Sequence, residues 1–246
     1  MSQRTLRRDY AVLHLVFRFA VEREYRPDNP IAPVRKLPVT PEEMRQPIVL
    51  ADDEIDRLLA ACTDRPMLYL FVLTCADTAM RPNSEALWLR WEDVDLREGI
   101  VRIVSGRDGH TTKTRTSRTL PLTPRLAAAF RHHAAAYRLA GGSPWIFHHA
   151  AADRHAAAGD RINDLRRAFG AAARRAKLPP GVWPYDLRHS RITRWVKAGH
   201  NLALIQKAAS HASMRTTLIY VHLDDDDLRA LVAPVNDGAM PRLAVG

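Results

Sequence analysis

Apolar residues recur at helical spacing through most of the chain. Near its start, Leu6, Tyr10 and Leu13 lie about one helical turn apart. This spacing predicts an amphipathic helix over residues 5–24. Capping residues and prolines divide the other periodic segments. We expect further helices over 52–62, 66–80, 85–91, 124–139, 160–177, 185–198, 202–210, 214–222 and 224–235.

One region has the two-residue period of a strand instead. Residues 99–104 alternate as a half-buried strand does, and residues 117–122 are the expected hairpin partner. The stretch 105–116 between them is rich in turn-forming residues and contains Lys113. The predicted fold class is therefore mainly α, an α+β arrangement with a small antiparallel β-sheet.

Prolines mark a change of organisation before residue 49. They follow one another at positions 27, 30, 33, 38, 41 and 47. Such a proline-rich segment is typical of an extended linker. We expect a short N-terminal segment over 1–36, a linker over 37–48 and a main domain over 49–246.

Composition narrows the class of protein. Hydrophobic residues make up 46% of the 246 positions, which is enough for a substantial core. Cys62 and Cys75 are the only cysteines, so no second pair completes a zinc site, and both are expected to be reduced core residues. No stretch approaches the roughly 20 apolar residues that a membrane span requires, and no signal-peptide pattern opens the chain. We therefore expect a cytoplasmic protein without membrane contact.

Positive charge is concentrated in one quarter of the sequence. The chain has a formal net charge of +10, and residues 161–220 contain twelve Lys or Arg side chains but only two carboxylates, Asp164 and Asp186. Solubilising charge alone is spread evenly over a surface. A local excess of this size indicates a surface that binds phosphates.

Residues of catalytic type gather in the same quarter. Arg188 lies in a predicted helix, His211 follows the next helix, and Tyr220 lies in the one after that. Singly, each has an ordinary explanation, as a solvated Arg, a capping His and a core Tyr. With a helix-turn-helix between them, the three side chains converge on one face beside the basic surface.

Three stretches resemble a known family. Residues 185–223, YDLRHSRITRWVKAGHNLALIQKAASHASMRTTLIYVHL, are similar to the H-x-x-R helix, G-H-x-x turn and terminal I-Y helix of the tyrosine recombinases, the phage integrase family. Residues 87–95 resemble the stretch that follows the family's first catalytic Arg, and residues 112–122 resemble its catalytic-lysine hairpin. The resemblance implies the helical catalytic fold of DNA breaking-rejoining enzymes, and site-specific DNA recombination or integration as the activity.

By position, the resemblance also implies roles for individual residues. Arg81 and Arg188 would bind the scissile phosphate, and Lys113 would protonate the departing sugar oxygen. His211 would hydrogen-bond the phosphate and help to place Tyr220, the nucleophile that forms a 3′-phosphotyrosyl intermediate. Two fixed guanidinium groups can neutralise the charge that grows on a phosphodiester during attack, so this chemistry requires no metal and no cofactor.

Three features depart from the family pattern. Tyr185 stands where H-x-x-R has its His, and a neutral phenol can donate a hydrogen bond but is a poor base near pH 7. One additional residue separates Arg81 from Glu85, and Glu85 is expected to be the structural partner of an Arg rather than a base. The segment 1–36 corresponds only to the last part of the family's helical core-binding domain, so weaker DNA binding is expected.

The resemblance implies double-stranded DNA as the partner and a homotetramer that acts on two duplexes. Two other functions compete with recombination. A catalytically impaired DNA-binding remnant of an integrase would keep the fold without useful cleavage, and a type IB topoisomerase-like nicking enzyme would share the chemistry but act on one duplex. A helix-turn-helix transcription factor is a weaker third alternative, because it requires neither the Lys hairpin nor Tyr220.

Overall fold

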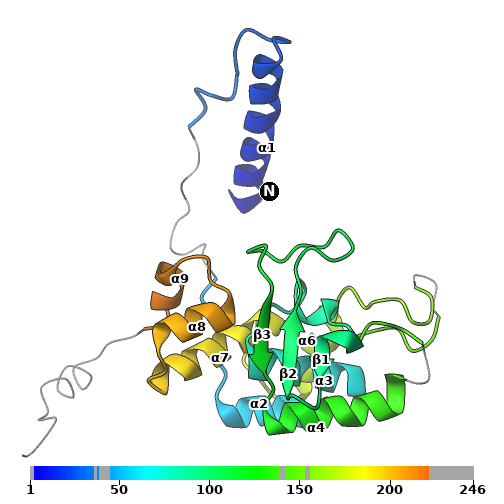
Figure 1. Cartoon of the computed structure of the whole chain (residues 1–246). Helices are drawn as coiled ribbons and strands as arrows, with labels where there is room; N and C mark the ends of the chain where they lie inside the picture. Colours follow the sequence, from blue (N-terminus) through cyan, green and yellow to red (C-terminus); the bar gives the residue numbers. More distant parts are fainter. Residues whose placement is uncertain (1–2, 36–37, 39–44, 139–141, 153–155, 222–246) are drawn as a thin grey trace, which may run out of the picture. The chain divides into compact units, whose positions relative to one another are not determined.

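The computed structural model of the chain describes residues 3–35, 38, 45–138, 142–152 and 156–221 (Figure 1). The chain divides into two compact units, Met1–Gln46 and Pro47–Gly246. In the first unit, α1 (Gln3–Glu22) is the predicted N-terminal helix, and the side-chain amide of Asn29 donates a hydrogen bond to the carbonyl of His14. The helix predicted over 224–235 lies outside the described residues.

The helices of the second unit lie where the periodic pattern predicts them, with shifted ends. Their bounds are α2 (Asp52–Ala60), α3 (Pro66–Thr78), α4 (Pro124–His133), α6 (Arg166–Arg175), α7 (Pro184–Lys197), α8 (Leu202–Ala209) and α9 (Met214–Leu218). Short 3₁₀ turns η2 (Ala86–Trp88) and η3 (Trp91–Asp93) follow α3, and the π-helical turn η4 (Ala134–Arg138) continues α4.

Helix α3 is the centre of this unit. Every residue from Leu70 to Thr78 is buried, and the helix packs against α2, α4 and α7. A helix that is apolar on all sides requires such neighbours around it. Phe71 of α3 meets Phe147 edge to face, with ring centroids 5.9 Å apart. The helix ends at Ala79, whose backbone takes the left-handed conformation with φ 55°.

The predicted hairpin is present and has a third strand. Strands β1 (Val94–Asp95), β2 (Ile100–Ile103) and β3 (Arg118–Pro121) form an antiparallel sheet in the order β1-β2-β3. Val101 pairs with Leu120, and both side chains are buried in the core. The loop that joins β2 to β3 extends beyond the strands (Figure 1).

Two helix predictions need correction. The predicted helix 85–91 is instead the two turns η2 and η3, because backbone groups between them bond to another segment: the Ile146 N–H donates to the Leu89 carbonyl and the Trp91 N–H to the Pro144 carbonyl. The predicted helix 160–177 begins only at Arg166. Its backbone N–H donates to Asp164 Oδ1 at 2.8 Å, so Asp164 rather than Asp160 supports the helix start.

The start of the second unit is tied to α7 by Asp186 and Ser190. Asp186 is fully buried, and its carboxylate accepts hydrogen bonds from the backbone N–H groups of Ile48 (3.2 Å) and Trp183 (3.0 Å). The Leu50 N–H donates to Ser190 Oγ at 2.8 Å. These bonds fix the N-terminal turn of α7, which carries the motif around Arg188.

Replacing Asp186 with Ala should lower the free energy of unfolding by about 2–3 kcal/mol, because two backbone donors lose their buried acceptor. Asp186→Asn should lose less, since its amide oxygen still accepts a hydrogen bond. Urea denaturation followed by circular dichroism measures both changes. Asp53→Ala, at an exposed position of α2, is the matched control. Equal midpoints for Asp186→Ala and this control would contradict the anchoring role.

Candidate active site

Three arginines meet at the C-terminal end of α8. Arg118 Nε donates to the Ala208 carbonyl at 2.9 Å, Arg188 Nη2 to the Ala209 carbonyl at 2.5 Å, and Arg81 Nη2 to the Ser210 carbonyl at 2.8 Å. The last carbonyls of a helix lack partners within the helix and form the negative end of its dipole. Three consecutive carbonyls therefore each bind a guanidinium group from a different part of the chain.

Glu85 joins two of these arginines from the other side. Its carboxylate accepts from Arg81 Nη1 at 2.6 Å and from Arg118 Nη2 at 2.7 Å, and the side chain is buried. Burial opposes ionisation of Glu85, but the hydrogen bond and charge of Arg118, together with Arg81, hold its pKa below the ordinary value. The predicted role of Glu85 as the partner of an Arg agrees with these contacts.

The additional residue after Arg81 does not turn its side chain away from the site. The backbone N–H groups of Glu85 and Ala86 both donate to the Arg81 carbonyl at 3.0 Å, so the extra residue is taken up in a turn. Arg81 is buried, and its Nε atom has no hydrogen-bond partner among the described residues. A buried donor without an acceptor is costly, and an anion at this position would satisfy it.

Arg188 is only 1% exposed, an unusual burial for a guanidinium group. Its Nη1 donates at 2.5 Å to the carbonyl of Ala79, the residue that ends α3. Burial, followed by the charge of Arg81, lowers the pKa of Arg188 to about 10, so the group remains protonated at neutral pH. With Arg118, these arginines place three cations around the one carboxylate of Glu85.

His211 lies two residues after the last residue of α8. Ser210 takes the left-handed conformation, with φ 52°, and the His211 N–H closes the helix by donating to the Gln206 carbonyl. His211 Nδ1 lies 2.9 Å from Thr217 Oγ1 of α9. Burial and the positive charges of Arg188 and its neighbours lower the pKa of His211 to about 4, so the imidazole is neutral at neutral pH.

Tyr220 follows α9 and lies against two imidazole rings. Its ring is nearly parallel to that of His211, with centroids 6.1 Å apart. The Tyr220 hydroxyl lies 2.5 Å from Nδ1 of His189. Burial raises the pKa of Tyr220 to about 12, although the charge of Arg188 acts in the opposite direction. The structure thus brings Arg81, Arg188, His211 and Tyr220 together.

Lys113 lies in the loop between β2 and β3, and its side chain is exposed. The next residue, Thr114, places Oγ1 2.6 Å from Oγ of Ser210, the residue before His211. Lys113, Arg118 and His211 all line one groove between this loop and α8. The loop therefore reaches the site, whereas the Lys113 side chain extends into the open groove.

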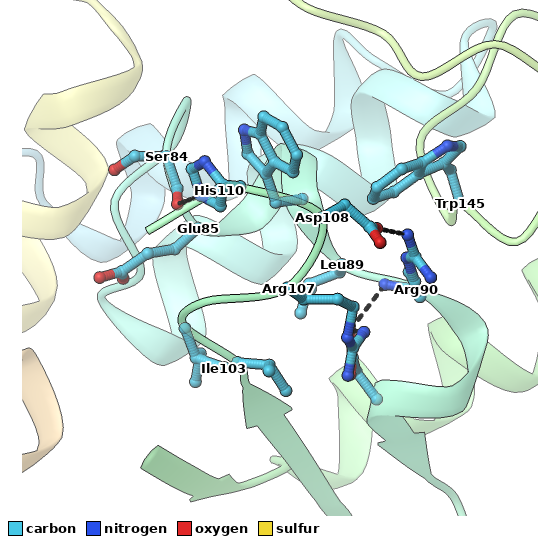
Figure 2. A pocket seen from close by; sticks show the side chains of 12 residues that line it. Ser84, Glu85, Leu89, Arg90, Ile103, Arg107, Asp108, His110 and Trp145 are labelled. Atoms are coloured by element: carbon cyan, nitrogen blue, oxygen red, sulfur yellow. Dashed lines mark hydrogen bonds and ion pairs between the residues drawn. The ribbon is translucent and has the colours of Figure 1, made fainter. Parts of the chain in front are cut away.

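The base of the same loop is fixed to the turn after Arg81. Figure 2 shows His110 beside Ser84, where its Nε2 lies 2.9 Å from the Ser84 carbonyl. The His110 ring stacks on Trp88 with centroids 3.6 Å apart. Arg107 forms an ion pair with Asp93 at 2.8 Å. These contacts limit the positions that the loop can take relative to Arg81.

Tyr185 is half-buried in the first turn of α7. Its ring lies 6.0 Å from Cζ of Arg188 and 5.2 Å, between centroids, from the ring of His189 one turn later. Tyr185 also lines a pocket with Arg81 and Trp183. Tyr185 therefore lies beside the arginine cluster, at the position that the motif predicts.

Sequence reasoning missed Arg118 and gave His189 little weight. Arg118 had a signal: in the alternating pattern of β3 it shares the inward face of Leu120, where a charged residue requires a buried partner. His189 also had one, since it follows Tyr185 by one helical turn and shares its face of α7.

The described part of the chain contains neither a membrane-spanning helix nor a metal site. Within it, no helix combines the length and the apolar character needed to cross a bilayer. In the same residues, no group of three or more His, Cys, Asp or Glu side chains is arranged to hold a metal ion. Cys62 and Cys75 are free and buried, as predicted.

Glu85→Gln should lower the free energy of unfolding at pH 7 by about 3 kcal/mol, because two buried guanidinium groups lose their counter-charge. The pKa of Glu85 is lowered in the folded state, so its contribution is complete well above the unfolded value near 4.5 and is lost as the pH falls further. The gap between wild type and variant should therefore narrow below about pH 4.5.

Urea denaturation at pH 7 and at a series of lower pH values measures this gap. Glu98→Gln, at an exposed position, is the control and should show almost no gap at any pH. A gap for Glu85→Gln that does not change with pH would mean that the carboxylate charge does not stabilise the cluster.

Comparison with known proteins places the chain in a family. Residues 49–227 match the model of the phage integrase family. The putative integrase/recombinase y4qK of Sinorhizobium fredii is 29% identical over 91% of this chain and 66% of its own length, so the chain spans just under two thirds of that relative. The tyrosine recombinase XerC of Xanthomonas axonopodis pv. citri is 28% identical over 98% of this chain and 73% of its own length.

Solved structures share the fold of this chain. XerA recombinase has a TM-score of 0.60 at 26% identity and covers 90% of this chain and 73% of its own. The Tn1549 transposon integrase has a TM-score of 0.70 at 20% identity, covering 95% and 80%. The predicted fold class and family resemblance are confirmed. Through its matched domain, the chain belongs to the phage integrase family of site-specific tyrosine recombinases.

Proposed function

We propose that Tyr220 attacks a DNA phosphodiester held by Arg81 and Arg188, and that the resulting 3′-phosphotyrosyl link is passed to a second DNA strand. The observation that carries this proposal is the buried cluster at the end of α8, which has an excess of positive charge and an Arg81 Nε atom without an acceptor among the described residues. An anion is the ligand that such a cluster requires.

The phosphate is held by the two guanidinium groups. Both are fixed by neighbouring carbonyls, Arg81 by that of Ser210 and Arg188 by that of Ala209. Donors that are already oriented need no reorganisation when negative charge grows on the phosphate oxygens in the transition state. Arg118 acts indirectly, because it binds Glu85 and orients Arg81 through that carboxylate.

His211 binds the phosphate as a neutral donor. When the Thr217 hydroxyl donates to its Nδ1, the hydrogen of the imidazole is on Nε2 and is available for a phosphate oxygen. Its ring also packs parallel to that of Tyr220 and thereby helps to hold the nucleophile. Tyr185 contributes a phenol hydroxyl as a further hydrogen-bond donor to the phosphate.

One bond forms and one bond breaks in the cleavage step. A bond forms between Tyr220 Oη and phosphorus while the bond from phosphorus to the 5′ oxygen breaks. Lys113 Nζ donates a proton to that oxygen, which leaves as a 5′ hydroxyl. Since a phosphodiester replaces a phosphodiester, the hydroxyl of another strand can reverse the step without an energy source.

The substrate proposed for this site is double-stranded DNA, bound by the basic surface around residues 161–220. Structures of the related Tn1549 integrase contain transposon DNA, and those of XerH contain its difH substrate. We further propose that a homotetramer brings two duplexes together in the cytoplasm. In this proposal, residues 49–246 are the catalytic domain, 37–48 the linker and 1–36 part of a core-binding domain.

Covalent capture from a library of random-sequence duplexes tests the activity. The protein is incubated with the library and denatured in SDS, and only DNA that remains covalently attached is sequenced. We expect wild type to enrich a site and Tyr220→Phe to capture nothing, since it lacks the attacking oxygen. Tyr69→Phe, which changes a half-buried tyrosine of α3, should capture as wild type does.

Other results would select among the alternatives. Tight DNA binding by wild type without any covalent link would support a DNA-binding remnant. Cleavage and relaxation of one duplex without joining of two duplexes would support a topoisomerase-like enzyme. Sedimentation of the complex with the captured duplex as two or fewer protomers would contradict the tetramer.

Lys113→Ala should slow covalent capture by about 10²–10⁴-fold, the usual contribution of a general acid. A 5′-bridging phosphorothiolate in the captured duplex should restore most of the rate, because a thiolate leaves without being protonated. Arg97→Ala, at an exposed position between β1 and β2, is the matched control and should show neither effect. A slow Lys113→Ala enzyme that the phosphorothiolate does not rescue would exclude the role as acid.

A further inference from the structure

The cleavage step leaves the hydroxyl proton of Tyr220 without an acceptor. The phenol is buried, and its pKa of about 12 makes spontaneous ionisation rare at neutral pH. A base within hydrogen-bond distance of the hydroxyl therefore has a large effect on the rate of attack. The geometry around the Tyr220 oxygen identifies the candidates for this base.

One imidazole nitrogen lies within hydrogen-bond distance of that oxygen. His189 Nδ1 is 2.5 Å from Tyr220 Oη, and the two ring centroids are 5.6 Å apart. His189 is half-buried on α7, directly after Arg188. Its neighbour Arg188 is fixed to two carbonyls, which holds this turn of α7 in place relative to Tyr220. The contact is therefore supported by a rigid part of the structure.

The other titratable and charged groups around Tyr220 are poorer acceptors. Nδ1 of His211 lies against Thr217 Oγ1, and the low basicity of this imidazole makes it a weak base. Tyr185 is a phenol like the nucleophile itself. Arg81 and Arg188 are cations that carry no lone pair for a proton. Among the groups described around the hydroxyl, His189 is the one whose ring nitrogen lies in contact with it and can carry a lone pair for its proton.

The position of His189 also explains the substitution at 185. Residues 185 and 189 are one helical turn apart and lie on the same face of α7, and their rings are 5.2 Å apart. The imidazole expected at position 185 is thus available one turn further along the helix. Tyr185 can then serve as a hydrogen-bond donor without having to accept a proton.

We propose that His189 is the general base that accepts the proton of Tyr220 during attack on DNA, an inference that rests on the proposed function. The neutral imidazole carries its hydrogen on Nε2 and its lone pair on Nδ1. As the bond between Oη and phosphorus forms, the Oη proton moves to Nδ1 and His189 becomes an imidazolium. In the ligation step the same proton returns to the departing phenolate oxygen.

His189→Asn tests this role with the captured duplex. The Asn side chain places an amide close to the position of Nδ1, so it preserves a polar contact but cannot accept a proton near neutral pH. We expect covalent capture to slow by about 10²-fold or more. The 5′-bridging phosphorothiolate should not restore the rate, since it removes the need for an acid and not for a base. Lys113→Ala, which it should rescue, provides the contrast in the same assay.

His132→Asn is the matched control, since it changes an exposed histidine of α4 that lies outside residues 161–220. Its capture rate should equal that of wild type. A rate for His189→Asn within about twofold of wild type would overturn the proposal, as would rescue by the phosphorothiolate. Because wild type is measured alongside, failure of this inference differs from failure of the proposed function, in which wild type captures no DNA.

A second measurement needs no DNA and covers the case of a variant that does not fold. In wild-type protein labelled with ¹⁵N-histidine, the Nδ1 signal of His189 should be that of an unprotonated nitrogen accepting a hydrogen bond. Tyr220→Phe should shift this signal, and Tyr69→Phe should not. A His189 signal that does not respond to Tyr220→Phe, or a protonated Nδ1, would overturn the proposal whatever the DNA assays give.

Discussion

The site depends on how the C-terminal carbonyls of α8 are satisfied. A helix leaves its last carbonyls without internal partners, and here three of them bind guanidinium groups from β3, α7 and the turn after α3. These segments are distant in sequence, so the helix end is the common reference point for their positions. The last of these carbonyls belongs to Ser210, and His211 is the next residue. The cations proposed to bind the phosphate and the adjoining imidazole are thus located by one set of bonds.

A surplus of buried positive charge is the electrostatic consequence. Glu85 compensates for part of it and is held ionised by Arg118 and Arg81, so the cluster is stable without becoming neutral. The remaining positive charge acts to lower the pKa values of the neighbouring His211 and Tyr220. Together with burial it keeps His211 neutral, and it opposes the effect of burial on Tyr220. A bound phosphate would balance this remaining charge, as the proposed function requires.

The loop that carries Lys113 is positioned from two sides. At one side Thr114 contacts Ser210, and at the other His110 stacks on Trp88 and reaches the Ser84 carbonyl (Figure 2). Both anchoring points adjoin residues of the arginine cluster. Lys113 itself remains exposed in the groove. In the proposed mechanism, this exposed side chain reaches the leaving oxygen from a loop whose backbone is held at both sides.

The sequence by itself determined the features that depend on near neighbours along the chain. Helical periodicity located the helices, alternation located the β2–β3 hairpin, and the motif from 185 to 223 identified the family. Local pattern failed where backbone groups bond to distant segments, as between Leu89 and Ile146. It also could not locate the two-residue strand β1, which is too short to show a period.

Only the tertiary structure decided which side chains meet. Arg118 and Ala208 are 90 residues apart, and Arg81 and Ser210 are 129 apart, so no local pattern could pair them. The same holds for Tyr220 and His189, whose contact depends on the packing of α7 and α9 rather than on a motif. Residue types and their spacing can be read directly from the sequence. Hydrogen-bond partners, burial and the resulting pKa changes require the three-dimensional structure, because they depend on how a helix end is covered by segments that are remote in sequence.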